Sequence, residues 1–245
     1  MPRSPSPHTR SLLIERAASL LAAREPVTLR SLVAGTGVST MAVYTYFDGM
    51  DGLWSAVREE GFRRLAERIA DVRAQRDPVR HLASLGVAYV ENAVAHPDLF
   101  RVMFDGTIGL SDRSTADSTF DLLVAASRDA IHAGRFSPTA DPADTALQFW
   151  ASGHGAVMLG ITGVLQHVAI VRLARDLQAA VFVHAGDTPA NARRSVNAAW
   201  PMDRPSHSSG TGSSNYRKKR CPGKLPRSLS SATWKQLECF LKTSL

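Results

Sequence analysis

The first 200 residues are most informative in what they lack. They contain no lysine and no cysteine, and both cysteines of the chain, Cys221 and Cys239, lie beyond them without histidine-rich surroundings. Neither a metal site nor a cysteine nucleophile is therefore expected. No apolar run approaches the roughly 18 residues that span a bilayer, and the polar, proline-rich start lacks the apolar core of a signal peptide. We expect a cytoplasmic protein with no membrane partner.

Motifs of common enzyme sites are also missing. The sequence has no HExxH zinc motif, no GxxxxGK[ST] phosphate loop and no GxSxG nucleophile turn. The eight histidines are scattered, and no pair lies four residues apart with a carboxylate between them. We therefore predict no catalytic residue, no metal ligand and no cofactor, and expect that the protein is not an enzyme.

The net charge of +7 suggests nucleic-acid binding until it is mapped along the chain. Residues 1–76 carry 11 Arg and 8 acids, residues 77–200 carry 9 Arg and 12 acids, and residues 201–245 carry 9 Lys or Arg and 2 acids. These sums are +3, −3 and +7, so the last segment accounts for the whole excess. The net charge is thus weak evidence for DNA binding.

Residues 201–245 differ in composition from everything before them. This segment holds all five lysines, is rich in Ser, Gly and Pro, and has no Val or Ile. Such a composition cannot bury enough apolar surface to fold alone. Two interpretations stay open: a non-native extension from a frameshift, readthrough or vector, and a genuine basic tail that strengthens nonspecific DNA contact.

Apolar residues recur at helical spacing through the first 200 residues, with no useful strand-like alternation. Thr28 and Ser39 are expected to cap the second and third helices, and Asp48 with Asp51 to form a capping box for a long fourth helix. The predicted helices span 8–24, 28–34, 40–46, a long segment after Asp48, 79–95, 97–104, 114–133, 142–163 and 165–185. The predicted fold class is all-α, with an N-terminal three-helix helix-turn-helix head joined by a long helix to a larger helical body.

The segment from Leu29 to Phe47 has the spacing of a helix-turn-helix motif. Val33, Val38 and Val43 are expected to pack between its two short helices, and Phe47 to fix the pair against the first helix. A short helix held in this way can place its N-terminal turn in the DNA major groove. The side chains predicted to contact DNA are Thr28, Arg30, Ser39, Thr40, Met41, Tyr44, Thr45 and Tyr46.

An alternative interpretation treats the two tyrosines of this segment as half-buried core residues. Tyr44 and Tyr46 lie two positions apart and so point to different faces of a helix, and at least one of them must face outward. Periodicity alone also fits a three-helix bundle that does not bind DNA.

The stretch TGVSTMAVYTYFDGMDGLW, residues 36–54, resembles the TetR (tetracycline-repressor-like) family of bacterial transcriptional regulators. The turn glycine, the cap, the tyrosine and the phenylalanine fall at the family's offsets, and the resemblance covers about residues 9–60. It implies a DNA-binding regulator. One position departs from the pattern, because Met50 stands where the family commonly has a phosphate-contacting lysine. Arg30, or Arg3 and Arg10, would have to replace that charge.

Two segments of the body, HPDLFRVMF (96–104) and LQFWASGHGAVMLGITG (147–163), resemble the C-terminal domain subtype named for its Trp, His and Gly, here Trp150, His154 and Gly155. The resemblance implies a body that dimerises through its last two helices and encloses an effector pocket. The alternative for any of the candidate ligand residues is an ordinary core position. The candidate ligand contacts are Phe100, Met103, Phe104, Phe120, Phe149, Trp150 and His154.

Apolar stripes on the last two predicted helices are expected to form a four-helix interface in a twofold dimer. On 142–163 the stripe consists of Leu147, Trp150, Ala151, His154, Val157, Met158 and Ile161, and on 165–185 of Val168, Val171, Leu177 and Val181.

The predicted organisation is a flexible arm (1–8), the DNA-binding head (9–60), the effector-binding and dimerisation body (61–186) and a tail (187–245) expected to be disordered. We expect a homodimeric transcriptional regulator, a repressor, whose affinity for double-stranded operator DNA is modulated by a small-molecule effector of unknown identity. The alternative function is an all-α small-molecule-binding or structural protein without sequence-specific DNA binding.

Overall fold

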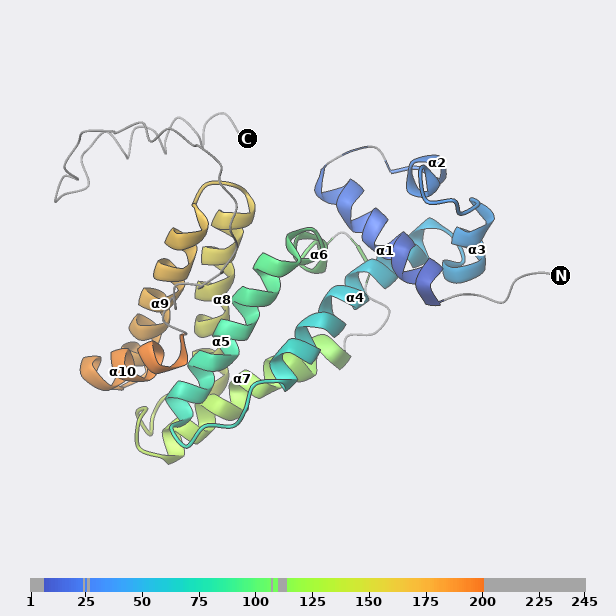
Figure 1. Ribbon diagram of the computed structural model, residues 1–245. Coiled ribbons are helices and arrows are strands. Elements are labelled where there is room, and N and C mark those ends of the chain that lie inside the picture. The colour runs from blue at the N-terminus through green and yellow to red at the C-terminus, as the bar shows by residue number, and fades with distance from the viewer. Residues whose placement is uncertain (1–6, 24, 26, 107, 110–113, 201–245) are drawn as a thin grey trace, which may run out of the picture. The chain divides into compact units, whose positions relative to one another are not determined.

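The computed structural model describes residues 7–23, 25, 27–106, 108–109 and 114–200, and within these ranges it contains ten helices and no strand (Figure 1). The prediction of an all-α fold is confirmed. Residues 1–6 and 201–245, including Arg3, Cys221 and Cys239, lie outside the described ranges. The helices are α1 Pro7–Ala22, α2 Leu29–Val33, α3 Met41–Phe47, α4 Met50–Ala70, α5 Pro78–Ala95, α6 Pro97–Met103, α7 Ser114–His132, α8 Pro142–Ile161, α9 His167–His184 and α10 Pro189–Ala199.

The head is a small apolar core enclosed by α1, α2, α3 and the start of α4. Leu13, Leu32, Val43 and Leu53 are fully buried there. The five-residue helix α2 is held by a reciprocal capping box: Thr28 Oγ1 accepts a hydrogen bond from the Ser31 amide at 3.1 Å, and Ser31 Oγ accepts one from the Thr28 amide at 2.9 Å. The predicted cap of the second helix is therefore confirmed.

The caps predicted for the next two helices are wrong. Thr40, not Ser39, is the N-cap of α3, without a side-chain bond, and Asp48 ends α3 in a left-handed conformation with φ of 58°. Gly49 then precedes α4, again without a side-chain cap. The cause is a very tight turn, because a Cβ on Gly52 would lie 1.9 Å from the carbonyl oxygen of Phe47. Asp48 is used to reverse the chain and cannot act as a cap.

Helix α6 belongs to both cores. Its residues Leu99 and Val102 are buried in the head core, whereas Phe100 and Met103 are buried in the body core. The predicted boundary at residue 60 also falls inside the continuous helix α4, which runs from the head to the body in Figure 1. Head and body are therefore joined by two helices rather than by a linker, and all described residues belong to one compact unit.

Helix α10 contradicts the predicted start of the tail at residue 187. The side chains of Ala192, Val196 and Trp200 lie four residues apart and are buried in the body core. Thr188 caps the helix by accepting from the Asn191 amide at 3.3 Å. The body thus extends to Trp200, because this four-residue spacing gives the segment an apolar face.

The predicted dimerisation stripe on α8 divides between two faces. Trp150 and His154 turn toward the interior of the body and Val157 is buried, whereas Ala151 is exposed together with Leu159. Helices α8 and α9 run side by side in Figure 1. Their outer surface forms a shallow apolar groove lined by Ala151, Ser152, Gly155, Ala156, Met158, Leu159, Thr162, Leu173 and Leu177.

Candidate functional site

Helix α3 presents large side chains to solvent. Met41 is 66% exposed and Tyr44 is 52% exposed, and Thr40 and Thr45 are exposed beside them. The Thr45 hydroxyl donates to the Met41 carbonyl oxygen at 3.0 Å, so it is held against its own helix. Tyr46 lies half-buried, with its ring 6.2 Å from that of Phe47. Of the two tyrosines, Tyr44 is therefore the outward one, and Tyr46 mainly supports the head core.

The remaining head candidates lie around this helix. Thr28, Arg30 and Ser39 are exposed, but the Thr28 hydroxyl is already used by the capping box. The guanidinium of Arg10 lies 5.5 Å from the centre of the Phe47 ring, which keeps one cation on the head surface. Met50 is partly buried against the head core.

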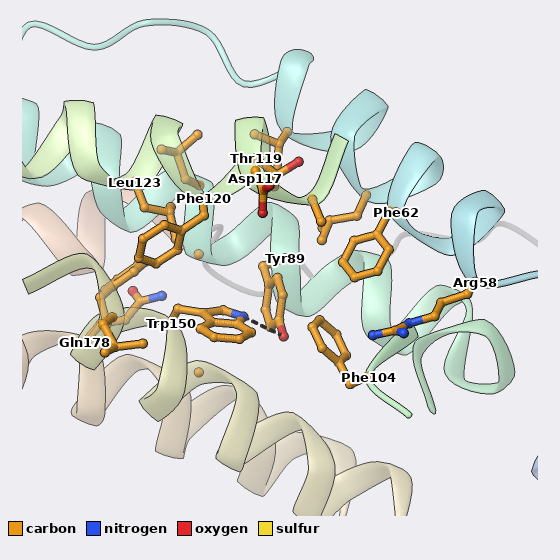
Figure 2. Close-up of a pocket in the computed structure, with 18 residues that line it drawn as sticks. Arg58, Phe62, Tyr89, Phe104, Asp117, Thr119, Phe120, Leu123, Trp150 and Gln178 are labelled. Carbon is orange, nitrogen blue, oxygen red and sulfur yellow. Dashed lines mark hydrogen bonds between the residues drawn. The ribbon is translucent and has the colours of Figure 1, made fainter. Parts of the chain in front are cut away.

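The body contains a cavity of about 400 Å³ between α4, α5, α7, α8 and α9 (Figure 2). Its walls are mostly apolar, and six of its lining side chains carry aromatic rings. The lining consists of Arg58, Phe62, Leu65, Ile69, Leu85, Gly86, Tyr89, Phe104, Ala116, Asp117, Thr119, Phe120, Leu123, Leu147, Phe149, Trp150, Gly153 and Gln178.

The structure brings four of the seven predicted ligand contacts to this cavity: Phe104, Phe120, Phe149 and Trp150. Phe100 and Met103 do not line it, because both are fully buried in the packing around α6. His154 does not line the cavity itself, but it is hydrogen-bonded to Tyr89, which does.

A polar chain crosses the aromatic wall. Trp150 Nε1 donates to the hydroxyl of Tyr89 at 3.2 Å, and that hydroxyl lies 2.8 Å from Nδ1 of His154. Burial lowers the pKa of His154, which favours the neutral imidazole, and burial raises the pKa of the Tyr89 phenol. Tyr89 therefore donates its proton to Nδ1 of a neutral His154, and its hydroxyl is satisfied on both sides.

Sequence reasoning missed five polar residues of the cavity: Arg58, Tyr89, Asp117, Thr119 and Gln178. Arg58 of α4 donates from Nε to the Met103 carbonyl at 2.8 Å and from Nη1 to the Ile108 carbonyl. Gln178 of α9 is 2% exposed and accepts from Trp200 Nε1 at 3.0 Å through Oε1. A lone glutamine between apolar neighbours on α9 was the available signal. The arginine gave none, since α4 carries several others.

Two absences concern the described part of the chain alone. Within it, no group of three or more His, Cys, Asp or Glu side chains is arranged to hold a metal ion. No helix there is long and apolar enough to cross a membrane.

Comparisons with known proteins fit this arrangement. Residues 82–198 match the family model described as tetracyclin repressor-like, C-terminal domain. No curated protein matches the sequence. A solved structure of a protein of unknown function from Rhodococcus sp. RHA1 is 26% identical, with a TM-score of 0.61, 76% of this chain covered and 100% of that chain.

Two further structures show the same fold. RolR, solved with its ligand resorcinol, is 19% identical with a TM-score of 0.55, covering 80% of this chain and 96% of that chain. The TetR-family protein CprB from S. coelicolor A3(2) is 21% identical with a TM-score of 0.62, covering 78% and 94%.

A helix-turn-helix head joined to a helical body with an internal cavity defines the class of ligand-responsive transcriptional regulators. Within that class, residues 82–198 match the tetracyclin repressor-like C-terminal domain, and the chain has the fold of the TetR-family structures. The matched model is a general tetracyclin repressor-like domain, so the narrower Trp-His-Gly subtype stays a prediction.

Proposed function

We propose that this protein is a cytoplasmic, homodimeric repressor, without enzymatic activity, that binds operator DNA and is released by a small-molecule effector in the body cavity. The observation that carries the proposal is the position of α6, with side chains in the head core and in the core around the cavity. A ligand in the cavity can then bias the position of the head.

The DNA contacts assigned to the head are those of its exposed surface. Met41 and Tyr44 on α3 would meet base edges and backbone, with Thr40 at the start of the helix. Arg30 and Arg10 would supply the phosphate contacts that Met50 cannot supply.

The proposed coupling between a ligand in the cavity and the head depends on Arg58 and Phe104. Arg58 lies on α4 and holds the carbonyl of Met103 at the end of α6, and both Arg58 and Phe104 line the cavity. An effector that displaces either side chain changes the contact between α4 and α6. This is a two-state coupling, in which the effector binds one arrangement of the heads better than the other. The resorcinol complex of RolR, which has the same fold, supports a small-molecule ligand.

The groove on α8 and α9 supports a twofold dimer. Val168 on α9 is 77% exposed and Leu159 on α8 is 40% exposed, so these helices present apolar surface that a second copy would cover. A dimer also explains how a short helix gains specificity, because two copies can contact half-sites about 34 Å apart.

The test is a salt-dependent footprint on the DNA upstream of the protein's own gene. We expect protection of two half-sites and a log–log salt slope set by about 0.9 ions per phosphate contact. A flat slope without protection would contradict the proposal and favour a small-molecule-binding or structural protein. Sedimentation of wild type and Leu159→Arg tests the dimer, which the arginine should dissociate.

A further inference from the structure

From the cavity's geometry we infer that its ligand is a small, flat, neutral aromatic compound that carries a carbonyl-type oxygen, bound by the side-chain amide of Gln178. The role of this ligand as an effector rests on the proposed function, whereas its chemistry rests on the cavity alone.

The hydrogen-bonding direction of Gln178 is fixed by its neighbour. The indole of Trp200 can only donate, so the atom it contacts at 3.0 Å must be the amide oxygen of Gln178. The amide nitrogen of Gln178 therefore points away from Trp200, toward Gly86. Among the described residues this bond to Trp200 is the only hydrogen bond of the Gln178 side chain. An N–H₂ group in a side chain that is 98% buried thus lines the cavity without a protein acceptor.

The backbone of α5 leaves room for this amide. A Cβ on Gly86 would lie 2.3 Å from Nε2 of Gln178 and 2.6 Å from Cζ of Phe149. The missing side chain lets the donor and the ring reach the same part of the cavity. A donor that faces the cavity without a protein acceptor is available to an acceptor atom of a ligand.

Other polar groups of the cavity are already satisfied or balanced. Tyr89 uses its hydroxyl for Trp150 and His154. Arg58 donates to two backbone carbonyls and lies at the end of the cavity opposite Gln178 in Figure 2, and Asp117 on α7 also lines the cavity and carries the opposite charge. No excess charge remains to compensate an ion, and an uncompensated buried ion is strongly disfavoured. A neutral ligand follows.

The walls select for flat rings. Phe104 and Phe120 stand 5.9 Å and 6.3 Å from the Trp150 indole between ring centres, at interplanar angles of 45° and 70°. These rings are tilted against one another, so a flat ligand beside them can meet both a ring face and a ring edge, the arrangement that aromatic partners favour. Its volume of about 400 Å³ is near the lower end of the ~300–1,000 Å³ of small-molecule sites, which fits two or three fused rings.

The experiment measures binding of matched probes to the full-length protein by equilibrium dialysis, without DNA. 2-Acetylnaphthalene has the acceptor oxygen, and 2-ethylnaphthalene has the same carbon skeleton without it. 2-Naphthoate and protonated 1-(2-naphthyl)ethylamine add a charge, and 2-undecanone keeps the ketone but lacks rings. We expect 2-acetylnaphthalene to bind tightest, about tenfold better than 2-ethylnaphthalene, as the loss of one buried hydrogen bond predicts.

Substitutions test which residues cause the preference for 2-acetylnaphthalene over the other probes. Gln178→Leu should bring the ratio between the ketone and the hydrocarbon close to one, whereas Gln148→Leu, on the exposed face of α8, should leave it unchanged. Trp200→Phe removes the indole donor and keeps the amide, and it should lower the ratio less than Gln178→Leu does. Phe120→Leu should reduce the advantage of 2-acetylnaphthalene over 2-undecanone. Circular dichroism confirms that each variant is folded.

The inference is overturned if the ketone and the hydrocarbon bind wild type equally, if a charged or aliphatic probe binds tightest, or if no probe binds. It is also overturned if Gln178→Leu, folded, keeps the ketone preference. The footprint without ligand is scored separately. A protein that prefers the ketone but protects no upstream DNA retains this inference and loses the proposed function.

Discussion

The head and the body of this protein are stabilised by different kinds of core. The buried side chains of the head are almost all aliphatic, with Phe47 as the aromatic exception, and none of them is polar. All buried polar side chains of the described residues lie in the body: Asn92, Ser127, Thr145, Gln178, Asp187 and Ser195. Apolar packing suffices to hold α1, α2 and α3 in one arrangement. The body surrounds a cavity, and polar networks there fix particular contacts.

The largest expected effect comes from breaking the main polar network of the body. Arg135 bridges Asp77 at 2.7 Å and the buried Asp187 at 2.6 Å, which ties the start of α5 to the start of α10. Arg135→Ala leaves the buried Asp187 without a cation, with only the Thr188 amide donating to it, and should lower the free energy of unfolding by about 3–5 kcal/mol. Urea unfolding followed by circular dichroism measures it. Arg193→Ala, exposed on α10, is the control. Equal losses for both variants would show that the network adds no stability.

The corresponding change in the head removes apolar packing alone. Leu32 on α2 is fully buried against the head core. Leu32→Ala should cost about 2–4 kcal/mol and abolish DNA protection, because α2 and α3 lose their shared support. Cavity binding of 2-acetylnaphthalene in the folded variant should be nearly unchanged. If ligand binding by Leu32→Ala falls as much as DNA binding, the cavity of the body depends on the head core, and the two cores are not separate as described.

A smaller effect on stability is expected at Gly86, whose missing side chain leaves space for the amide of Gln178. Gly86→Ala places a methyl group against Gln178 and Phe149 and should destabilise the protein by about 1–2 kcal/mol despite the better helix propensity of alanine. Ligand affinity should fall with it. Gly153→Ala is the comparison, since a Cβ at Gly153 meets nothing within 4 Å. Thermal unfolding should show Gly153→Ala as neutral or stabilising, and the reverse order would contradict the packing argument.

Protonation of His154 in the body should lower the free energy of unfolding by a still smaller amount. Burial lowers the pKa of His154, so the unfolded chain binds a proton more readily than the folded one. Stability is then complete above the ordinary histidine pKa near 6.5, declines as the pH falls below it and levels off below the folded pKa. His154→Gln should give a shallower decline of unfolding free energy between pH 7 and pH 5. An unchanged slope would exclude His154 as the titrating group. His81, whose pKa burial also lowers, remains in both proteins.

Much of the fold could be predicted because helical periodicity is a local property. The spacing around Val33, Val43 and Phe47 placed the head helices within one or two residues of α2 and α3. The place of Asp48 at the end of α3 could not be predicted, since it depends on how closely α4 approaches the carbonyl of Phe47. That approach is a tertiary contact.

The candidate cavity was predictable in its rings but not in its polar groups. Phe104, Phe120 and Trp150 stand out as aromatic residues on apolar helix faces. Arg58 and Gln178 become cavity residues only because α4 and α9 meet the same space, across 120 positions of sequence. α10 was missed for another reason: the segment was grouped with the tail by composition, although the spacing of Val196 and Trp200 indicated a helix.

The smallest effect on stability is expected on the exposed face of α3, where the head meets solvent. Thr40→Ala, Met41→Ala and Tyr44→Phe should each change the free energy of unfolding by less than about 0.5 kcal/mol, because these side chains make little contact with the core. Their effect on DNA should differ. Tyr44→Phe should weaken binding across sequences, because it removes a hydrogen-bond donor to the backbone. Thr40→Ala and Met41→Ala should change the preference among sites. Selection of binding sites from random DNA measures both. If the Thr40 and Met41 variants keep the wild-type preference, α3 does not lie in the major groove as assigned.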